Sequence, residues 1–281
     1  MIDLCFLRPI TVKGKIRLGN RSDGGYVLYE RLLGQADALV TYGVGWDISF
    51  EEQFNRLTGK PVIMFDPTMF GKHLLNSKRL KQYLLSFRFG AGAVQLIQTW
   101  KLWRLKKKME SRQVFFVNEG IAARRQDRYD TLGHHLERFQ LTEKRLVLKM
   151  DIEGGEYNIL ADKATYKHFE KADQLIIEFH DLKRRLRDLR AICGELALHF
   201  SLVHIHGNNC GPTFTLYDLD SDMNNDVQFP DVLELVWVRS DRLSKEDISD
   251  ERISYPVAGL DFPNDPNRKD YSLDAILATG Q

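Results

Sequence analysis

Three carboxylates and a pair of glycines follow an apolar run near the middle of the chain. Residues 146–150 form the run, and Asp151, Glu153 and Glu156 come directly after it, around two adjacent glycines. A run that is apolar on both faces is typical of a buried parallel strand. An acidic residue at the end of such a strand lies at the carboxyl edge of the sheet, where open α/β sheets bind ligands. Glu153 and Glu156 could instead only complement the positive end of the following helix, but Asp151 lies among apolar residues, and a buried carboxylate needs a partner.

Two histidines come at the ends of later apolar runs. His180 follows residues 173–179, and His206 closes the next run. An imidazole titrates near neutral pH and therefore suits a general base, although each histidine could equally be a hydrogen-bonded structural residue. We predict His180 and His206 as candidate bases, with Asp151 or Glu153 orienting the base, so that all four are candidate catalytic residues.

A divalent metal is a further option at the same place. His204 and His206 point to the same face of an extended strand, and together with Asp151 and His180 they could hold a divalent ion. The spacing of these residues does not require an ion. The sequence therefore leaves a metal open and assigns no metal ligands.

A glycine-containing loop follows a short apolar run in the first quarter of the chain. Gly43 and Gly45 come first, then Asp47, and then the spacing of a helix. Glycines between a strand and a helix let the backbone approach a ligand closely. The dinucleotide-binding fingerprint would need a third glycine at the position of Ile48, so the loop predicts a nucleotide-type ligand without identifying it.

Polar residues also end the next two expected strands. Asp66 closes residues 61–65, and an acidic residue there typically accepts hydrogen bonds from ribose hydroxyls, although Asp before Pro also favours a turn. Asn118 and Glu119 follow residues 113–117. The predicted cofactor site is formed by Gly43, Gly45, Asp47, Asp66, Asn118, Glu119 and Asp151.

A turn-rich stretch lies in the amino-terminal part of the chain. Residues 17–28 contain Asp-Gly-Gly before an apolar run, which is typical of a hairpin. The polar residues around this turn could instead contact a ligand, as could the two asparagines that follow the run ending at His206. The predicted substrate site is formed by Arg21, Asp23, Tyr26, Asn208 and Asn209.

Seven short apolar runs must position these residues. They are residues 36–42, 61–65, 113–117, 145–152, 173–179, 201–206 and 232–238. Expected helices separate the runs until the last pair. This alternation predicts an α/β fold: a Rossmann-like doubly wound sheet, mostly parallel with a C-terminal antiparallel hairpin, and helices on both faces. Because the carboxyl ends of parallel strands share one edge, we expect the polar residues to converge there, with the cofactor on the first half of the edge and the chemistry on the second.

The length of the chain and the distribution of its charges indicate its domain organisation and the possible partners of its basic segment. A chain of 281 residues allows one large α/β domain. We expect a single domain over residues 1–281, with an N-terminal extension at 1–35, a basic helical insertion at 69–113 and a C-terminal wrap at 240–281. The insertion could lie on an anionic membrane surface, receive an acidic substrate, or dock on the acidic residues of the last quarter of the chain.

Other features of the sequence indicate where in the cell the protein is expected. The chain has no apolar run long enough to span a bilayer, and its first residues do not have the pattern of a secretion signal. Three cysteines without metal-type spacing are typical of reduced thiols. We expect a cytoplasmic protein, associated with the inner face of the membrane if the insertion binds lipid, and no nucleic acid partner.

The stretch from Lys149 to Tyr157, KMDIEGGEY, resembles the K-x-D-[IV]-E-G-x-E-[WY] signature of FkbM-type methyltransferases, which use S-adenosylmethionine. The resemblance extends in strand order over residues 36–240. It implies that Gly43 and Gly45 approach the methionine part of the cofactor, that Asp66 holds the ribose, that Asn118 and Glu119 lie near the adenine, and that Asp151 faces the cofactor's amino group or the substrate. The family usually has an acidic residue before the first glycines, and this chain has Tyr42.

A second resemblance concerns the acceptor. Sequences of this family from capsule and lipopolysaccharide loci are similar at Asp23-Gly24-Gly25-Tyr26, at His206-Gly207-Asn208-Asn209 and in a Leu-Asp-x-Pro-Asn tail. The resemblance implies an O-methyltransferase acting on a sugar or glycan hydroxyl in surface polysaccharide biosynthesis, with a sugar, nucleotide-sugar or lipid-linked glycan as substrate. The alternatives are a non-catalytic Rossmann-like scaffold and a dinucleotide-dependent oxidoreductase, which the missing third glycine disfavours.

Overall fold

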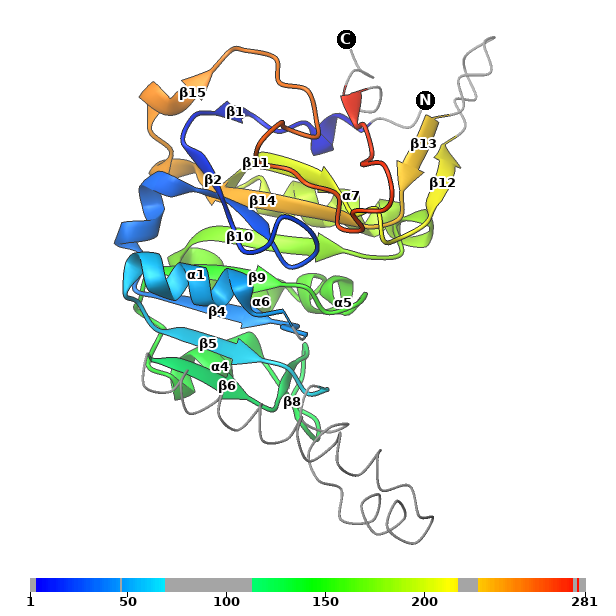
Figure 1. Ribbon diagram of the computed structural model, residues 1–281. Coiled ribbons are helices and arrows are strands. Elements are labelled where there is room, and N and C mark those ends of the chain that lie inside the picture. Colours follow the sequence, from blue (N-terminus) through cyan, green and yellow to red (C-terminus); the bar gives the residue numbers. More distant parts are fainter. Residues whose placement is uncertain (1–3, 46, 69–112, 217–226, 275–276, 278–281) are drawn as a thin grey trace, which may run out of the picture.

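The computed structural model describes residues 4–45, 47–68, 113–216, 227–274 and 277. A seven-stranded sheet forms its centre, in the spatial order β11-β14-β10-β9-β4-β5-β6 (Figure 1). The strands are β4 (Ala38–Tyr42), β5 (Val62–Phe65), β6 (Val114–Val117), β9 (Leu146–Met150), β10 (Ala172–Phe179), β11 (Phe200–Gly207) and β14 (Leu233–Arg239). The strands from β10 to β6 pair in parallel, and β14 is antiparallel to both neighbours. The predicted mostly parallel sheet with an antiparallel C-terminal pair is confirmed.

The order of the strands reverses between β4 and β9. The chain winds outward from β4 through β5 to β6, then returns to the other side of β4 and winds outward through β9 and β10. Open α/β sheets bind ligands at such a switch point, beyond the carboxyl ends of the strands. The sheet differs from the dinucleotide-binding order because β14 enters between β10 and β11.

Apolar residues on both faces explain why the central strands are parallel and covered. Every residue of β4, β9 and β10 is buried. Because neighbouring residues of a strand point to opposite faces, Val40 and Leu148 belong to one core cluster and Leu39 and Val147 to the other. The sheet therefore needs a layer on each face.

Helices lie on both faces of the sheet, as predicted. The first face packs against α4 (Leu132–Arg138), α5 (Glu156–Leu160) and α7 (Leu182–Leu196). The second packs against α1 (Ser49–Thr58) and against a hairpin of β2 (Lys15–Leu18) and β3 (Tyr26–Tyr29). This hairpin is the structure that the turn signal at residues 17–28 predicts.

Within the described residues, further short strands and the short helix α6 lie outside the central sheet. They are α6 (Lys163–Tyr166), the pair β7 (Gly120–Ile121) and β8 (Tyr129–Asp130), the ribbon β12 (Thr213–Leu216) and β13 (Val227–Pro230), and the pair β1 (Thr11–Val12) and β15 (Ile248–Ser249). The predicted basic insertion at residues 69–113 lies outside the described residues except for Gln113. Within the described part of the chain, no helix is both long and apolar enough to cross a membrane.

The amino-terminal hairpin is fixed to the central sheet by a buried glutamine. Gln174 on β10 accepts a hydrogen bond from the backbone N–H of Tyr29 at 2.8 Å and donates to the carbonyl of the same residue at 3.0 Å. Both polar groups of the glutamine amide are thus satisfied inside the core, as burial requires. The two bonds anchor the end of β3 that lies farthest from the loop of the hairpin.

Candidate functional site

A cavity of about 240 Å³ opens at the switch point of the sheet. It lies beyond the ends of β4, β5 and β9, and the hairpin loop closes one side. We call it the switch-point cavity and define it by its lining residues: Asp23, Gly24, Tyr26, Gly43, Val44, Gly45, Asp47, Glu51, Asp66, Thr68, Lys149, Asp151 and Glu153. Six of these residues carry carboxylates and one is a lysine, so the lining is strongly acidic. Residues from three expected strand ends and from the hairpin converge here.

Gly43 lies where the ends of β4 and β9 touch. Its φ of 73° is in the left-handed region, and a Cβ atom on it would lie 1.5 Å from the carbonyl oxygen of Asp151. The backbone N–H of Asp151 donates in turn to the carbonyl of Tyr42 at 3.0 Å. Only glycine allows this close approach, so the residue sets the distance between the two loops that form the floor of the cavity.

Asp66 bonds the glycine loop with one carboxylate oxygen and Thr68 with the other. Oδ2 accepts from the backbone N–H of Gly45 at 3.1 Å, and Oδ1 accepts from the N–H and the hydroxyl of Thr68, each at 2.7 Å. The turn that Asp before Pro favours is therefore present. The same side chain also lines the cavity.

Asp47 and the hairpin loop close the other side of the cavity. Asp47 accepts from the backbone N–H of Ser49 at 2.8 Å, at the start of α1. A Cβ atom on Gly24 would lie 2.5 Å from the Asp47 carboxylate, so the loop packs directly on it. Asp23 is fixed by Asn264, whose carbonyl accepts from the Asp23 N–H at 3.1 Å. The helix start that could receive a phosphate group is thus already occupied by a carboxylate.

Tyr26 and Lys149 hold the carboxylate of Asp151 in place. Its Oδ2 accepts from the hydroxyl of Tyr26 at 3.0 Å and from the ammonium of Lys149 at 3.4 Å. The ammonium also lies 4.4 Å from the centre of the Tyr26 ring and donates to the carbonyl of Gly43 at 3.2 Å. Lys149 is 3% exposed. Burial alone would lower its pKa, but the charges of Asp151, Glu51 and Glu178 raise it overall, so it remains a cation under the cavity floor.

His180 lies beside Asp151, as predicted, among several carboxylates. Its Nδ1 is 3.2 Å from Oε1 of Glu156. Its Nε2 is 3.6 Å from Glu153, 3.6 Å from Glu178 and 3.9 Å from Asp151. Burial alone would lower the pKa of His180, but the hydrogen bond and charge of Glu156 and the nearby carboxylates raise it. Burial, and then the charges of Asp151 and Glu234, hold the pKa of Glu178 well above its ordinary value.

His206 does not reach the switch-point cavity. It is 1% exposed, with Nδ1 3.4 Å from Glu234 and Nε2 3.1 Å from Asp270. Burial opposes its charge, but these carboxylates, together with Asp261, raise the pKa of His206 to about 10. An imidazolium with both nitrogens paired has no lone pair for a substrate proton at neutral pH. Its neighbour His204 bonds Asp261 at 2.8 Å, so neither histidine joins Asp151 and His180 as a metal ligand.

The pairing of His206 makes a pH-dependent contribution to stability. The pKa is 6.5 in the unfolded chain and about 10 in the folded one, so the contribution is complete below about pH 6.5 and is lost as pH rises through about 10. We expect His206→Gln to lower the free energy of unfolding by about 3 kcal/mol at neutral pH, because it leaves Glu234 and Asp270 unpaired, and to flatten the loss of stability above pH 7. Urea unfolding at several pH values checks this. His199→Gln, at an exposed position, is the control, and an unchanged pH slope in His206→Gln would contradict the assignment.

The two predicted substrate-binding asparagines have structural contacts. Asn208 donates to Glu178 at 2.9 Å and lies behind the carboxylates around His180. Asn209 is 0% exposed; it donates to the carbonyls of Asp265 and Arg268 and accepts from the N–H of Asp265 at 2.7 Å. It therefore clamps the C-terminal segment and does not line the cavity. Arg21 lies over the ring of Phe262 at 5.4 Å.

Asn118 and Glu119 lie at the end of β6, beside but not in the lining of the cavity. Glu119 pairs with Arg138 of α4 at 2.8 Å. The side-chain oxygen of Asn118 is buried and has no hydrogen-bond partner among the described residues. A buried acceptor without a partner costs free energy, and a ligand donor that reached it would satisfy it.

Glu51, Lys149 and Glu178 are site residues that the sequence-based prediction does not assign. Glu51 is 2% exposed on α1 and accepts from the hydroxyl of Thr41 at 3.0 Å. The signal for Lys149 is a cation inside an otherwise apolar strand, since such a group must find a buried partner. The signal for Glu178 is similar: it is a carboxylate within the buried strand β10, and it too needs a partner.

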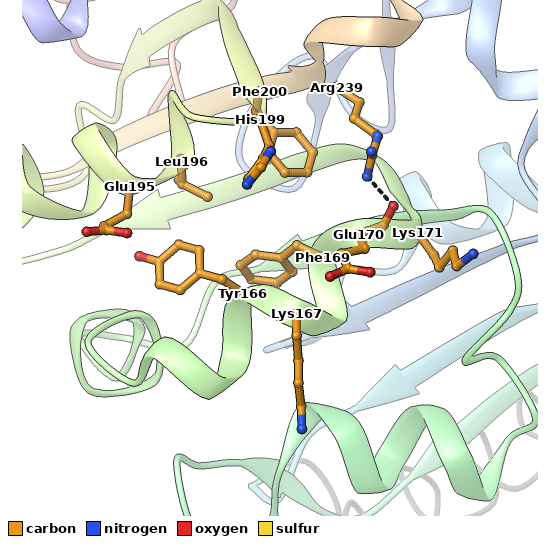
Figure 2. A pocket seen from close by; sticks show the side chains of 10 residues that line it. All are labelled: Tyr166, Lys167, Phe169, Glu170, Lys171, Glu195, Leu196, His199, Phe200 and Arg239. Atoms are coloured by element: carbon orange, nitrogen blue, oxygen red, sulfur yellow. Dashed lines mark hydrogen bonds between the residues drawn. The ribbon is translucent and has the colours of Figure 1, made fainter.

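A larger cavity of about 500 Å³ lies at the opposite edge of the sheet (Figure 2). Its residues come from the segment before β10, the end of α7 and the ends of β11 and β14: Tyr166, Lys167, Phe169, Glu170, Lys171, Glu195, Leu196, His199, Phe200 and Arg239. Arg239 donates to the carbonyl of Glu170 across it. This edge holds the amino ends of β10 and β11, away from the switch point, and size alone does not make it the site.

The comparisons with known proteins concern the fold. No family model and no curated protein matches the chain. Solved structures similar to it include an rRNA methylase from Streptococcus thermophilus (11% identity, 74% of this chain and 92% of that one, TM-score 0.37) and a precorrin-6y C5,15-methyltransferase from Geobacter metallireducens (11%, 72% and 79%, 0.33). A third is Sp1610 from Streptococcus pneumoniae in complex with S-adenosyl-L-methionine (15%, 77% and 75%, 0.32). At TM-scores below 0.5, nothing about the activity of this chain follows from the likeness.

Proposed function

We propose that this chain is an S-adenosylmethionine-dependent O-methyltransferase that acts on a hydroxyl of a sugar or glycan. The observation that carries the proposal is the acidic lining of a cavity at the switch point of the sheet. Asp23, Asp47, Asp66, Asp151 and Glu153 surround it. Such a lining favours a ligand with positive charge and disfavours an anionic one. S-adenosylmethionine carries a sulfonium and an ammonium.

The same lining argues against a dinucleotide. A pyrophosphate would need the N-terminus of α1, where the carboxylate of Asp47 accepts from the N–H of Ser49 and where Glu51 is also in the first turn. The third glycine of the fingerprint is replaced by Ile48, which is 8% exposed. An oxidoreductase is therefore the weaker candidate. A scaffold without turnover would not need the clustered imidazole and carboxylates of His180, Asp151 and Glu153.

The residues present fit the proposed cofactor. The Gly43–Gly45 loop lets the backbone approach the methionine part, Asp66 would hold the ribose hydroxyls, and Asp151 would hold the amino group. Bound there, S-adenosylmethionine supplies a methyl group that a nucleophilic oxygen can attack. Asn118, whose side-chain oxygen has no hydrogen-bond partner in the part of the chain that the structure describes, lies on the side where the adenine is proposed.

The chain's own residues have two tasks in this reaction. The cavity must hold donor and acceptor in line, which the tight contact between Gly43 and Asp151 supports. The acceptor hydroxyl must lose its proton as the carbon–oxygen bond forms and the carbon–sulfur bond breaks. The proton passes into the cluster of Asp151, Glu153 and His180, where Glu153 has a side chain that is 88% exposed and can exchange it with solvent.

The proposed acceptor is a sugar, a nucleotide-sugar or a lipid-linked glycan of surface polysaccharide synthesis, of which the sugar enters the acidic cavity and any phosphate stays outside it. The support is the resemblance at residues 23–26, and Asp23 and Tyr26 line the cavity. The proposed setting is the cytoplasm, because three cysteines without metal-type spacing are typical of reduced thiols. The basic segment at 69–113 is proposed to contact the inner membrane surface or an acidic substrate, and no nucleic acid partner is proposed.

Calorimetry with the full chain tests the cofactor. We expect S-adenosylmethionine and its demethylated product to bind at one site per chain and NAD⁺ not to bind, because the acidic lining repels a pyrophosphate. Binding should raise the free energy of unfolding by about 2.7 kcal/mol at a hundredfold excess over Kd. Tight NAD⁺ binding without S-adenosylmethionine binding would overturn the proposal in favour of the oxidoreductase.

A further inference from the structure

Asp151, Glu178 and His180 bring three ligand atoms to one point at the end of β9 and β10. One atom from each residue lies within 4.8 Å of the others. The His180 Nε2 lies 3.6 Å from Glu178 and 3.9 Å from Asp151. These separations are too long for hydrogen bonds. They are close to the roughly 3 to 3.5 Å between neighbouring ligands of one ion at bond lengths of about 2.1 Å.

A contact with Glu156 orients the imidazole ring of His180. The hydrogen bond between its Nδ1 and Oε1 of Glu156, at 3.2 Å, favours the tautomer with the proton on Nδ1. The lone pair of Nε2 then points toward the carboxylates. Glu156 is 0% exposed, and its Oε2 has no hydrogen-bond partner among the described residues. A carboxylate that orients a histidine in this way is the usual second partner of a metal-bound imidazole.

Each carboxylate presents one oxygen to the histidine, Oδ1 of Asp151 and Oε1 of Glu178, and Oε1 of Glu178 also accepts from Asn208. Asp151 uses Oδ2 for Tyr26 and Lys149, so its Oδ1 faces His180. Glu178 is 4% exposed and is held by Asn208 at 2.9 Å. Within the described residues, Lys149 is a buried cation in contact with Asp151. Carboxylates therefore outnumber cations at this point, and a bound cation would lower their repulsion.

We propose that Asp151, Glu178 and His180 bind one divalent metal ion beside the switch-point cavity. Two carboxylates and one imidazole are a mixed ligand set of the kind that accepts Mn²⁺ and similar ions, with positions left for water or substrate. The inference rests on the proposed function in one respect: an ion there would draw the acceptor hydroxyl to it and make its proton easier to remove. That proton would then leave through the exposed Glu153, and the ion itself is not consumed.

Mn²⁺ titration of the full chain after chelator treatment, followed by electron paramagnetic resonance, tests the proposal. We expect one Mn²⁺ per chain, with a nitrogen coupling from the imidazole of His180. His180→Gln should abolish that coupling, and both His180→Gln and Glu178→Gln should weaken binding at least tenfold. His199→Gln, on the opposite edge of the sheet, should bind as the natural chain does. Thermal unfolding of each variant establishes that it is folded.

The outcomes separate this inference from the proposed function. No Mn²⁺ binding, or binding without a nitrogen coupling and unchanged in both variants, would overturn the metal site. S-adenosylmethionine binding is measured separately by calorimetry. If S-adenosylmethionine binds and Mn²⁺ does not, only the metal site fails. If Mn²⁺ binds as expected and S-adenosylmethionine does not, the metal site holds and the methyltransferase fails. The nitrogen coupling is read from the natural chain, so it does not depend on a variant that could misfold.

Discussion

Gly43→Ala is expected to weaken S-adenosylmethionine binding at least tenfold. The added Cβ would lie 1.5 Å from the carbonyl oxygen of Asp151, so the ends of β4 and β9 must move apart. The movement displaces the floor of the cavity, and a displacement of about 1 Å at such a site can cost about a hundredfold in rate. Calorimetry with S-adenosylmethionine measures the loss of affinity directly.

Gly59→Ala is the matched control for this substitution. Gly59 ends α1 with a φ of 67°, which is close to the 73° of Gly43, but a Cβ there meets nothing within 4 Å. Both variants carry the strain of alanine in the left-handed region, about 1 kcal/mol, and only one blocks the cavity floor. If both variants bind S-adenosylmethionine as the natural chain does, the cofactor does not lie against this loop.

Lys149→Met is expected to lower the free energy of unfolding by about 4 kcal/mol. The ammonium is buried and contacts Asp151 at 3.4 Å, the carbonyl of Gly43 at 3.2 Å and the face of the Tyr26 ring. Methionine fills similar space but leaves the neighbouring carboxylate without its buried cation, and breaking such a pair typically costs 3 to 5 kcal/mol, so about 4 is expected here. Urea unfolding at neutral pH provides the measurement.

Lys163→Met on α6 is the control for Lys149→Met, because it removes the lysine of an exposed ion pair. The Lys163 side chain is 86% exposed and lies 4.0 Å from Glu195, so its loss should change stability by less than about 0.5 kcal/mol. An effect of Lys149→Met as small as that of Lys163→Met would mean that Asp151 does not depend on the lysine. The site would then need another account of how the Asp151 carboxylate is held in place.

Sequence patterns predict the sheet well because its strands are buried on both faces. Continuous apolar runs mark β4, β9 and β10, and the polar residues that end them must share one edge once the strands are parallel. Asp66, Asp151 and His180 are placed near one another by that logic alone. The position of β14 between β10 and β11 could not be predicted, since it depends on long-range pairing that leaves no local pattern.

The roles of individual polar residues were harder to predict. His206 and Asn209 come at the end of a strand like His180, but they turn to the C-terminal segment, where Asp270 and the backbone of residues 265–268 meet them. A single sequence does not say which distant segment returns to a strand end. Glu178 and Lys149 are site residues that the sequence does not assign. A charged residue in a buried strand indicates that it has a partner, but the sequence does not identify that partner.

The place of β14 has a consequence during synthesis on the ribosome. β11 pairs in the sheet with β14 and not with β10, so it has no strand partner until Leu233–Arg239 has been made. At about 5 to 20 residues per second, the ribosome needs seconds to make the segment between Gly207 and Leu233. During this time β4, β5, β6, β9 and β10 have been made and can pair with one another, but β11 cannot yet pair with β14. The edge of β10 is open during that interval, and a chaperone that covers exposed strand edges would find its binding site there.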